Sequence, residues 1–408
     1  MKFIDGGVCA ALGFTAAGLH VGVKTKNPNK KDLALIVADD VCNAAAVYTK
    51  NVVKAAPLHV TRAHLADGKA RAIIANSGNA NACAPLGEEN AELTCRAVAE
   101  KLGIAEGEIV VASTGVIGQT LPVGVITDGV PTLAGLLSRD GSDDAAAAIM
   151  TTDTVKKEAA VEFAVGGGTA RIGGIAKGSG MIHPNMGTML CFITTDCAIS
   201  VEMLNAALKS ATRESFNRIS VDGDTSTNDM CVVLASGKAG NAEITDIGED
   251  YAAFDGALRG LCVKLATEMA SDGEGAKHLI TCTVSNAETV DKAETIAKSV
   301  ISSTLFKAAV FGADANWGRV LCAMGYSGEE FAPDAVDVAF KSGAGTIEVC
   351  ESGRGLPFDE DLAKQILTEH DIEVLIDLHE QPLDSGACTC WGCDITYDYI
   401  KINGDYRT

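Results

Sequence analysis

The sequence has few aromatic residues and a deficit of positive charge. Phe, Trp and Tyr make up 5 % of its 408 residues, whereas hydrophobic residues as a whole make up 47 %. That hydrophobic content excludes a disordered chain and predicts a core of small and aliphatic side chains. Lys and Arg number 33 against 54 Asp and Glu, a net charge of −21. So acidic a surface repels phosphate backbones and disfavours nucleic acid as a partner.

Long apolar runs of the kind that cross a membrane are also missing. Residues 109–127 and 178–195 lack charge over about the span of a membrane helix, but both contain Pro, Gly and several hydroxyl or amide side chains. Residues 1–7 place an acid and two glycines after a short apolar start, which argues against a signal peptide. We expect no membrane association and a cytoplasmic location.

Cysteine is plentiful, but its pattern is not that of a disulfide framework. The 14 cysteines are scattered, and most lie in apolar runs, as is typical of buried free thiols in a reducing cytoplasm. Cys388, Cys390 and Cys393 are spaced closely enough to suggest a metal site, and with it a non-enzymatic metal-binding or interaction protein. A complete site needs a fourth ligand and a second spaced pair, so we predict no metal.

Short β-branched runs alternate with amphipathic helical patterns along the whole chain. We expect an α/β or α+β fold of layered sheets flanked by helices, with two to three domains and a subdomain boundary near Ser285. The predicted strands are residues 33–38, 72–75, 109–112, 189–193, 231–235, 279–284, 307–311, 372–378 and 395–402. The predicted helices are residues 91–102, 251–270, 290–301 and 360–369, and one that follows Ser200.

The segment 178–190 is the first candidate for chemistry. Its Gly187-Thr188 pair lies at the start of a predicted buried strand, so a small residue precedes a hydroxyl held by a rigid element. A hydroxyl needs an adjacent base to become a nucleophile, and a freed α-amine on the same residue is one such base. That chemistry requires cleavage of the bond between Gly187 and Thr188; an ordinary loop that enters a strand is the alternative.

Two polar strand ends could line a site. Thr114 and Gly115 follow a predicted strand, where backbone N–H groups and a hydroxyl could stabilise an oxyanion. Residues 76–81 form a similar polar segment, and a plain turn is the alternative for both. The acidic segment 221–229 resembles a cation loop in composition, but it lacks the twelve-residue pattern that ends in Glu. We therefore expect a turn before the strand 231–235.

A further set of residues suits an amino-acid ligand. The run Thr151-Thr152-Asp153-Thr154, Lys177 and Glu274 provide hydroxyls and opposite charges, with a cation for a carboxylate and an anion for an ammonium group. Ordinary surface charges are the alternative, although Lys177 and Glu274 lie in Gly-rich turns. No Gly-x-Gly-x-x-Gly motif occurs at a strand-helix junction, which weakens a dinucleotide interpretation.

Taken together, these segments resemble the ornithine acetyltransferase family, the glutamate N-acetyltransferases of arginine biosynthesis. The resemblance runs from residue 13 to residue 408, and its most specific motif is residues 177–190. It implies a fold similar to DmpA and the N-terminal-nucleophile hydrolases, and self-cleavage between Gly187 and Thr188. The products would be an α chain, residues 1–187, and a β chain, residues 188–408, with a C-terminal subdomain from about residue 285, assembled as an α2β2 heterotetramer.

The resemblance also assigns roles to residues. Thr188 matches the nucleophile, and Thr114 with Gly115 matches the oxyanion pair. The positions that hold the substrate amino acid are matched by Thr151, Lys177, Thr188, Glu274, Asn403 and Thr408. Asn403 and Thr408 rest on the resemblance alone. Gly187 stands where Ala is usual, and His183 replaces a small residue, but neither change removes a group that the mechanism needs.

The expected reaction is transfer of an acetyl group from N-acetylornithine to glutamate through an acetyl-threonine intermediate. Bifunctional members of the family also make N-acetylglutamate from acetyl-CoA; the sequence leaves open whether acetyl-CoA is a co-substrate here, and no other cofactor is expected. The alternative function is a self-processed N-terminal-threonine amidase or aminopeptidase.

Overall fold

The computed structural model describes residues 1–25, 29–183, 189–380 and 386–405. The chain divides into two compact units. Unit 1 consists of Met1–Gly178, Pro184–Asn217 and Thr225–Met269, and unit 2 of Ser179–His183, Arg218–Asp224 and Ala270–Thr408. The predicted subdomain from about residue 285 lies inside unit 2.

Unit 1 is built on a mixed nine-stranded sheet in the order β1-β6-β7-β8-β10-β3-β4-β5, with β2 paired to β3. The strands are β1 (Lys2–Ile4), β2 (Phe14–Leu19), β3 (Leu33–Tyr48), β4 (Lys69–Asn79), β5 (Ile109–Val116), β6 (Lys157–Val165), β7 (Gly168–Lys177), β8 (Leu190–Thr195) and β10 (Met230–Ala235). The five strands predicted in this unit, at 33–38, 72–75, 109–112, 189–193 and 231–235, all fall on these elements.

The long strand β3 folds this sheet into two halves. Its first part pairs with β2 and β4, its last part pairs with β10, and the register with β4 shifts between Val37 and Cys42. One buried cluster contains Ile36 and Ile73 from the first half and Phe192 and Val232 from the second. The two halves therefore face each other across a shared core, and the predicted layered α/β sandwich is confirmed.

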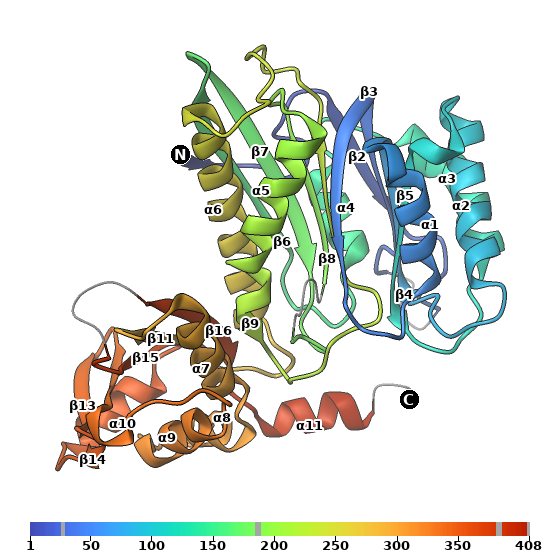
Figure 1. Cartoon of the computed structure of the whole chain (residues 1–408). Helices are drawn as coiled ribbons and strands as arrows, with labels where there is room; N and C mark the ends of the chain where they lie inside the picture. The colour runs from blue at the N-terminus through green and yellow to red at the C-terminus, as the bar shows by residue number, and fades with distance from the viewer. Residues whose placement is uncertain (26–28, 184–188, 381–385, 406–408) are drawn as a thin grey trace. The chain divides into compact units, whose positions relative to one another are not determined.

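Helices cover the outer faces of both halves (Figure 1). A second core cluster joins the β4 and β5 side to α2 and α3, and Leu261 and Leu265 of α6 lie against Gly174 of β7. The helices of this unit are α1 (Ala56–His64), α2 (Gly87–Leu102), α3 (Val123–Gly135), α4 (Ser142–Ile149), α5 (Val201–Arg213) and α6 (Glu249–Ser271), whose last two residues belong to unit 2. Ser200 caps α5 by accepting a hydrogen bond from the Met203 amide, so the predicted helix start is confirmed.

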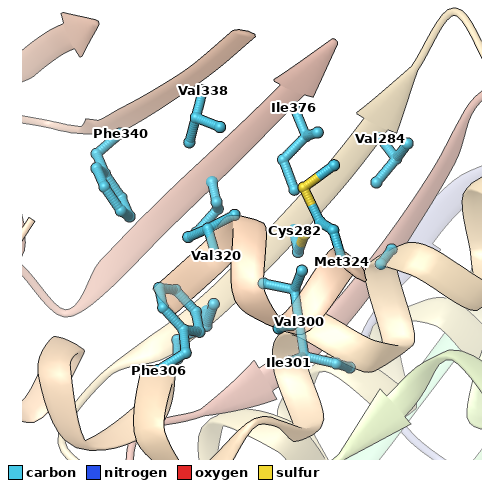
Figure 2. Packing of buried hydrophobic residues seen from close by; sticks show 14 of the residues in the cluster. Cys282, Val284, Val300, Ile301, Phe306, Val320, Met324, Val338, Phe340 and Ile376 are labelled. Carbon is cyan, nitrogen blue, oxygen red and sulfur yellow. The ribbon is translucent and has the colours of Figure 1, made fainter. Parts of the chain in front are cut away.

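Unit 2 has its own sheet and core. A seven-stranded sheet runs in the order β14-β13-β12-β15-β11-β16-β9. Its strands are β9 (Ile219–Ser220), β11 (Leu279–Ser285), β12 (Asp337–Ser342), β13 (Gly345–Glu351), β14 (Arg354–Gly355), β15 (Asp371–Asp377) and β16 (Cys388–Cys393). Its helices are α7 (Val290–Ser302), α8 (Thr304–Phe311), α9 (Trp317–Gly325), α10 (Glu360–Thr368) and α11 (Tyr397–Gly404). Figure 2 shows Val300, Val320 and Met324 packed toward Val338 and Ile376 of this sheet.

Two strand predictions in unit 2 are wrong. Residues 307–311 lie in α8, because the Ser303 side chain caps a helix there by accepting from the Phe306 amide. Residues 395–402 fall largely in α11, where Thr396 caps the helix by accepting from the Tyr399 amide. The apolar residues of both segments suit a short strand as well as a helix, so their pattern alone does not distinguish the two. The capping hydrogen bonds favour the helix in each case.

The cysteine group is part of the core. Cys388 and Cys390 lie at alternate positions of β16 and are buried in the unit 2 cluster. All 14 cysteines are free thiols. Within the described ranges no group of three or more His, Cys, Asp or Glu side chains is arranged to hold a metal ion. No helix in the described part of the chain is both long enough and apolar enough to span a membrane.

Phe306 tests the core of unit 2, because its ring is fully buried and stacks on Phe340 with 6.4 Å between centroids. We expect Phe306→Ala to lower the free energy of unfolding by about 3–5 kcal/mol, since it leaves a cavity. The matched control is the neighbouring Leu305, which is 55 % exposed; Leu305→Ala should change stability by no more than about 0.5 kcal/mol. Urea denaturation compares the two, and equal losses would contradict the observed core.

Candidate active site

The predicted oxyanion residues lie at the carboxyl end of β5. Thr114 is 9 % exposed, and it pairs with β4 at Ser77 while Gly115 pairs with Gly78. Gly115 has φ +134°, and a Cβ atom there would lie 2.3 Å from the carbonyl carbon of Gly78. A side chain at position 115 would therefore push the two strands apart, so glycine is required at this close approach.

Lys177 reaches Thr114 from the other half of the sheet. It is the last residue of β7, it is buried, and its Nζ donates a hydrogen bond to Thr114 Oγ1 at 3.4 Å. It also pairs with Leu190, the first residue of β8. Lys177 and Leu190 therefore lie side by side where β7 ends and β8 begins, and the ammonium group there contacts the Thr114 hydroxyl.

Thr151 is tied to the same place through Asp153. The Thr151 amide donates to Asp153 Oδ2 at 3.0 Å, and the Gly178 amide donates to Asp153 Oδ1 at 2.7 Å. Lys157 Nζ, fully buried, donates to the same Oδ1 at 2.7 Å. Burial by itself raises the pKa of Asp153, but the charges of Lys177 and Lys157 and the hydrogen bonds outweigh it and hold that pKa well below its ordinary value.

A third lysine adjoins this charge cluster. Lys24 Nζ donates to the carbonyl oxygens of Lys31 and Met150, each at 2.7 Å. Burial, partly opposed by Asp32 and reinforced by Lys30 and Lys177, lowers the pKa of Lys24 to about 8. The residues around Thr151 thus hold an excess of positive charge, which suits the carboxylate of an amino acid.

Glu274 and Asn403 come together within unit 2. Asn403 on α11 donates from Nδ2 to Glu274 Oε2 at 2.8 Å, and Glu274 is 7 % exposed. The Glu274 amide donates to the Ser179 carbonyl, and a Cβ atom at Gly180 would lie 2.4 Å from the Glu274 carboxyl carbon. Glu274, held by Asn403, therefore packs directly on residues 179 and 180 of the predicted cleavage motif.

Other unit 2 residues hold the next part of that motif. Asp222 accepts hydrogen bonds from the amides of Met181 and Ile182 and from the Tyr399 hydroxyl. His183 Nδ1 lies 3.1 Å from Ser220 Oγ. Burial, reinforced by the charge of Lys298, lowers the pKa of His183 to about 4, so the ring is neutral at pH 7.

Three predicted residues, Gly187, Thr188 and Thr408, lie outside the described residues. Thr114, Gly115, Thr151 and Lys177 belong to unit 1, and Glu274 and Asn403 belong to unit 2. Lys157, Lys24 and the role of Asp153 were not predicted from the sequence. Among these residues, only Asp153 gave a signal, as the acidic residue of the run 151–154. The segment 221–229 before β10 consists mainly of bends and contains no helix.

One sizeable hollow lies away from these residues. A cavity of about 890 Å³ in unit 1 is lined by Lys54, His59, Asn81 and Glu92, among others. Asn81, from the predicted polar segment 76–81, lines it, but the described residues predicted to act on the substrate do not: Thr114, Gly115, Thr151, Lys177, Glu274 and Asn403. Volume alone therefore does not locate the candidate active site, which is defined by its polar contacts.

Comparisons with known proteins agree with the sequence motifs. A model of the ArgJ family matches residues 15–408. The arginine biosynthesis bifunctional protein ArgJ of Symbiobacterium thermophilum is 50 % identical over 411 residues, 100 % of both chains. The protein of the same name from Caldanaerobacter subterraneus subsp. tengcongensis is 46 % identical over 409 residues, again 100 % of both. A solved structure of ornithine acetyltransferase complexed with ornithine, from Mycobacterium tuberculosis, is 37 % identical, covers 45 % of this chain and 98 % of its own, and has a TM-score of 0.41.

These matches define the class of protein, an acyltransferase enzyme of arginine biosynthesis. The chain belongs to the ArgJ family. The predicted family and the predicted acetyltransferase function are confirmed.

The buried ion pair of Asp153 and Lys157 should make the stability of the protein depend on pH. Asp153→Asn leaves a buried ammonium group without its carboxylate, so at pH 7 the free energy of unfolding should fall by about 3–5 kcal/mol. The folded-state pKa of Asp153 lies below the unfolded value, so its contribution is present above about pH 4 and is lost as the pH falls. Urea denaturation at pH 7 and pH 3 should show a smaller difference between wild type and variant at the lower pH.

Asp143 provides the control for this pair, because it forms an exposed ion pair with Lys156. Asp143→Asn should cost less than about 1 kcal/mol at either pH. A loss as large as that of Asp153→Asn would show that burial of the pair does not matter.

Proposed function

We propose that the chain cleaves itself between Gly187 and Thr188, and that Thr188 then carries the acetyl group. The contact that supports this most directly is the hydrogen bond from Lys177 Nζ to Thr114 Oγ1. Lys177 pairs with Leu190, and Thr188 is two residues earlier in the chain. The predicted nucleophile therefore belongs to the segment that begins beside the predicted oxyanion residues.

In the first half-reaction, the Thr188 α-amine accepts the hydroxyl proton as Oγ attacks the acetyl carbonyl of N-acetylornithine. Thr114 and the Gly115 amide stabilise the oxyanion. The Thr114 hydroxyl accepts a hydrogen bond from an ammonium group, and this polarises its O–H bond and makes it a stronger donor to developing negative charge. The α-ammonium returns the proton to the leaving amine, so ornithine departs and an acetyl ester remains on Thr188.

In the second half-reaction, the free amine of glutamate attacks the acetyl ester, and its proton passes through the Thr188 α-amine to Thr188 Oγ, which restores the hydroxyl and yields N-acetylglutamate. Lys177 and Thr151 would hold the substrate carboxylate, and Glu274 with Asn403 and Thr408 would hold the far end of the substrate, which in ornithine is a side-chain ammonium group. Acetyl-CoA would serve as a second donor to the same threonine. The cleaved chains would assemble as an α2β2 heterotetramer in the cytoplasm, where the 14 free thiols stay reduced.

Denaturing electrophoresis tests the cleavage. Purified wild type should separate into fragments of residues 1–187 and 188–408, whereas Thr188→Ala should remain one chain because it lacks the attacking hydroxyl. Thr188→Ser, which keeps the hydroxyl, should still cleave. A wild-type chain that stays intact while it is fully active would refute the proposal.

Dependence on an acceptor separates the transferase from an amidase. Ornithine release from N-acetylornithine should rise at least about tenfold when glutamate is added, because water is a poor competitor in a site that excludes it. A parallel assay with acetyl-CoA and glutamate reports the second activity. Release of ornithine at the same rate without glutamate would instead identify a hydrolase.

A further inference from the structure

Two adjacent residues, Asn228 and Asp229, lie just before β10 and have no role in the mechanism above. Both are buried, at 7 % and 1 % exposed. Asn228 donates both amide hydrogens across the unit, to the carbonyl oxygens of Ala80 at 2.6 Å and Ser113 at 2.7 Å. Ser113 directly precedes Thr114, so the Asn228 side chain fixes the backbone on which the oxyanion residues sit.

Asp229 faces the other catalytic strand. Met230, the next residue, pairs with Leu190, and its amide donates to the Met189 carbonyl at 2.8 Å. The Met189 amide and the hydroxyls of Ser226 and Thr49 are close enough to the Asp229 carboxyl group to lower its pKa. Met189 is the residue that follows the predicted nucleophile, so the backbone at residues 229 and 230 is joined to the backbone directly after Thr188.

The surroundings of the Asp229 carboxyl group favour its neutral, protonated form. Its Oδ2 atom is buried and has no hydrogen-bond partner among the described residues. An ionised oxygen in that position would be costly. Burial also raises the pKa of Asp229 well above its ordinary value, although the hydroxyls, Lys177 and the Met189 amide oppose the shift.

We propose that Asn228 and Asp229 form a brace that sets the spacing between the nucleophile and the oxyanion residues. Asn228 acts through Ser113 and Asp229 acts through Met189, so both are positioning residues. Their Cα atoms are about 3.8 Å apart across one peptide bond, and the two attachments therefore cannot move independently. The proposal rests on the proposed roles of Thr188 and Thr114. The brace should matter for catalysis because a misplacement of a catalytic group by about 1 Å can lower the rate by a factor of about 100.

A double-mutant cycle between Asn228→Ala and Thr114→Val tests the brace. Thr114→Val removes the hydroxyl and keeps the shape of the side chain. In the otherwise wild-type enzyme, Asn228→Ala should lower kcat about 10- to 100-fold per cleaved molecule, with KM for N-acetylornithine changed less than about threefold. In the Thr114→Val background the same change should cost several-fold less than in the otherwise wild-type enzyme, because the Thr114 hydroxyl is gone and only the Gly115 amide remains to be positioned. Independent, multiplicative losses would overturn the brace.

Asn241→Ala is the matched control. Asn241 also donates from its side-chain amide to a backbone carbonyl of unit 1, that of Ala198 at 3.0 Å, beyond the opposite end of β8. Its loss should leave kcat within about twofold of wild type, as expected for a site remote from the chemistry. A loss equal to that of Asn228→Ala would show that any such amide matters, and would also overturn the brace.

Asp229 provides an independent arm in case Asn228→Ala does not fold. Asp229→Asn keeps an acceptor for the Met189 amide without charge, so cleavage and kcat should stay within about threefold of wild type. Asp229→Ala removes the acceptor and should lower kcat about 10- to 100-fold, with little change in KM. Equal losses in both variants would overturn neutral positioning by Asp229. Failure of the proposed function would look different, because Thr188→Ala would then keep its activity.

Discussion

The arrangement of unit 1 around the candidate site depends on one buried carboxylate. Asp153 is 3 % exposed, and its two oxygens accept from Lys157 and from the amides of Thr151 and Gly178. A buried charge is tolerated only when it is paired and fully hydrogen-bonded. These contacts tie the turn after α4 to the end of β7, and they therefore determine where Lys177 emerges toward Thr114.

The bend in β3 explains why residues distant in the sheet order can meet. The strands β5 and β7 are separated by four others along the sheet, yet Lys177 contacts Thr114. They can do so because β3 carries the sheet from one half to the other, around the shared core that contains Ile36 and Phe192. A strand continuous through both halves fixes their relative placement better than a loop would. Polar groups at the facing strand ends can then be held within hydrogen-bond distance.

The sequence predicted the elements whose signals are local, and it failed where partners are distant. The period of α6 and the cap at Ser200 are readable within a few residues, and both predictions are confirmed. The strand predicted at 307–311 is wrong because the decisive signal is a single capping serine before an apolar run. Thr114 and Lys177 were selected by their turns and by family resemblance. The Asp153 contacts and the brace could not be predicted, because Gly178 and Ser113 lie far from their partners in sequence.

The two charge-free stretches that are about as long as membrane spans contain buried strands of the sheet. Residues 109–116 form β5, and residues 190–195 form β8, whose residues are all buried. A strand that is buried on both faces must be apolar along its whole length, so the absence of charge reflects position in the sandwich. Lys177 and Asp153 then place their charges in surroundings of low dielectric, where each interaction is stronger than at the surface. The same burial that gives Lys177 influence over the Thr114 hydroxyl makes the opposite charge of Asp153 important, because a buried charge is tolerated only near a partner of opposite sign.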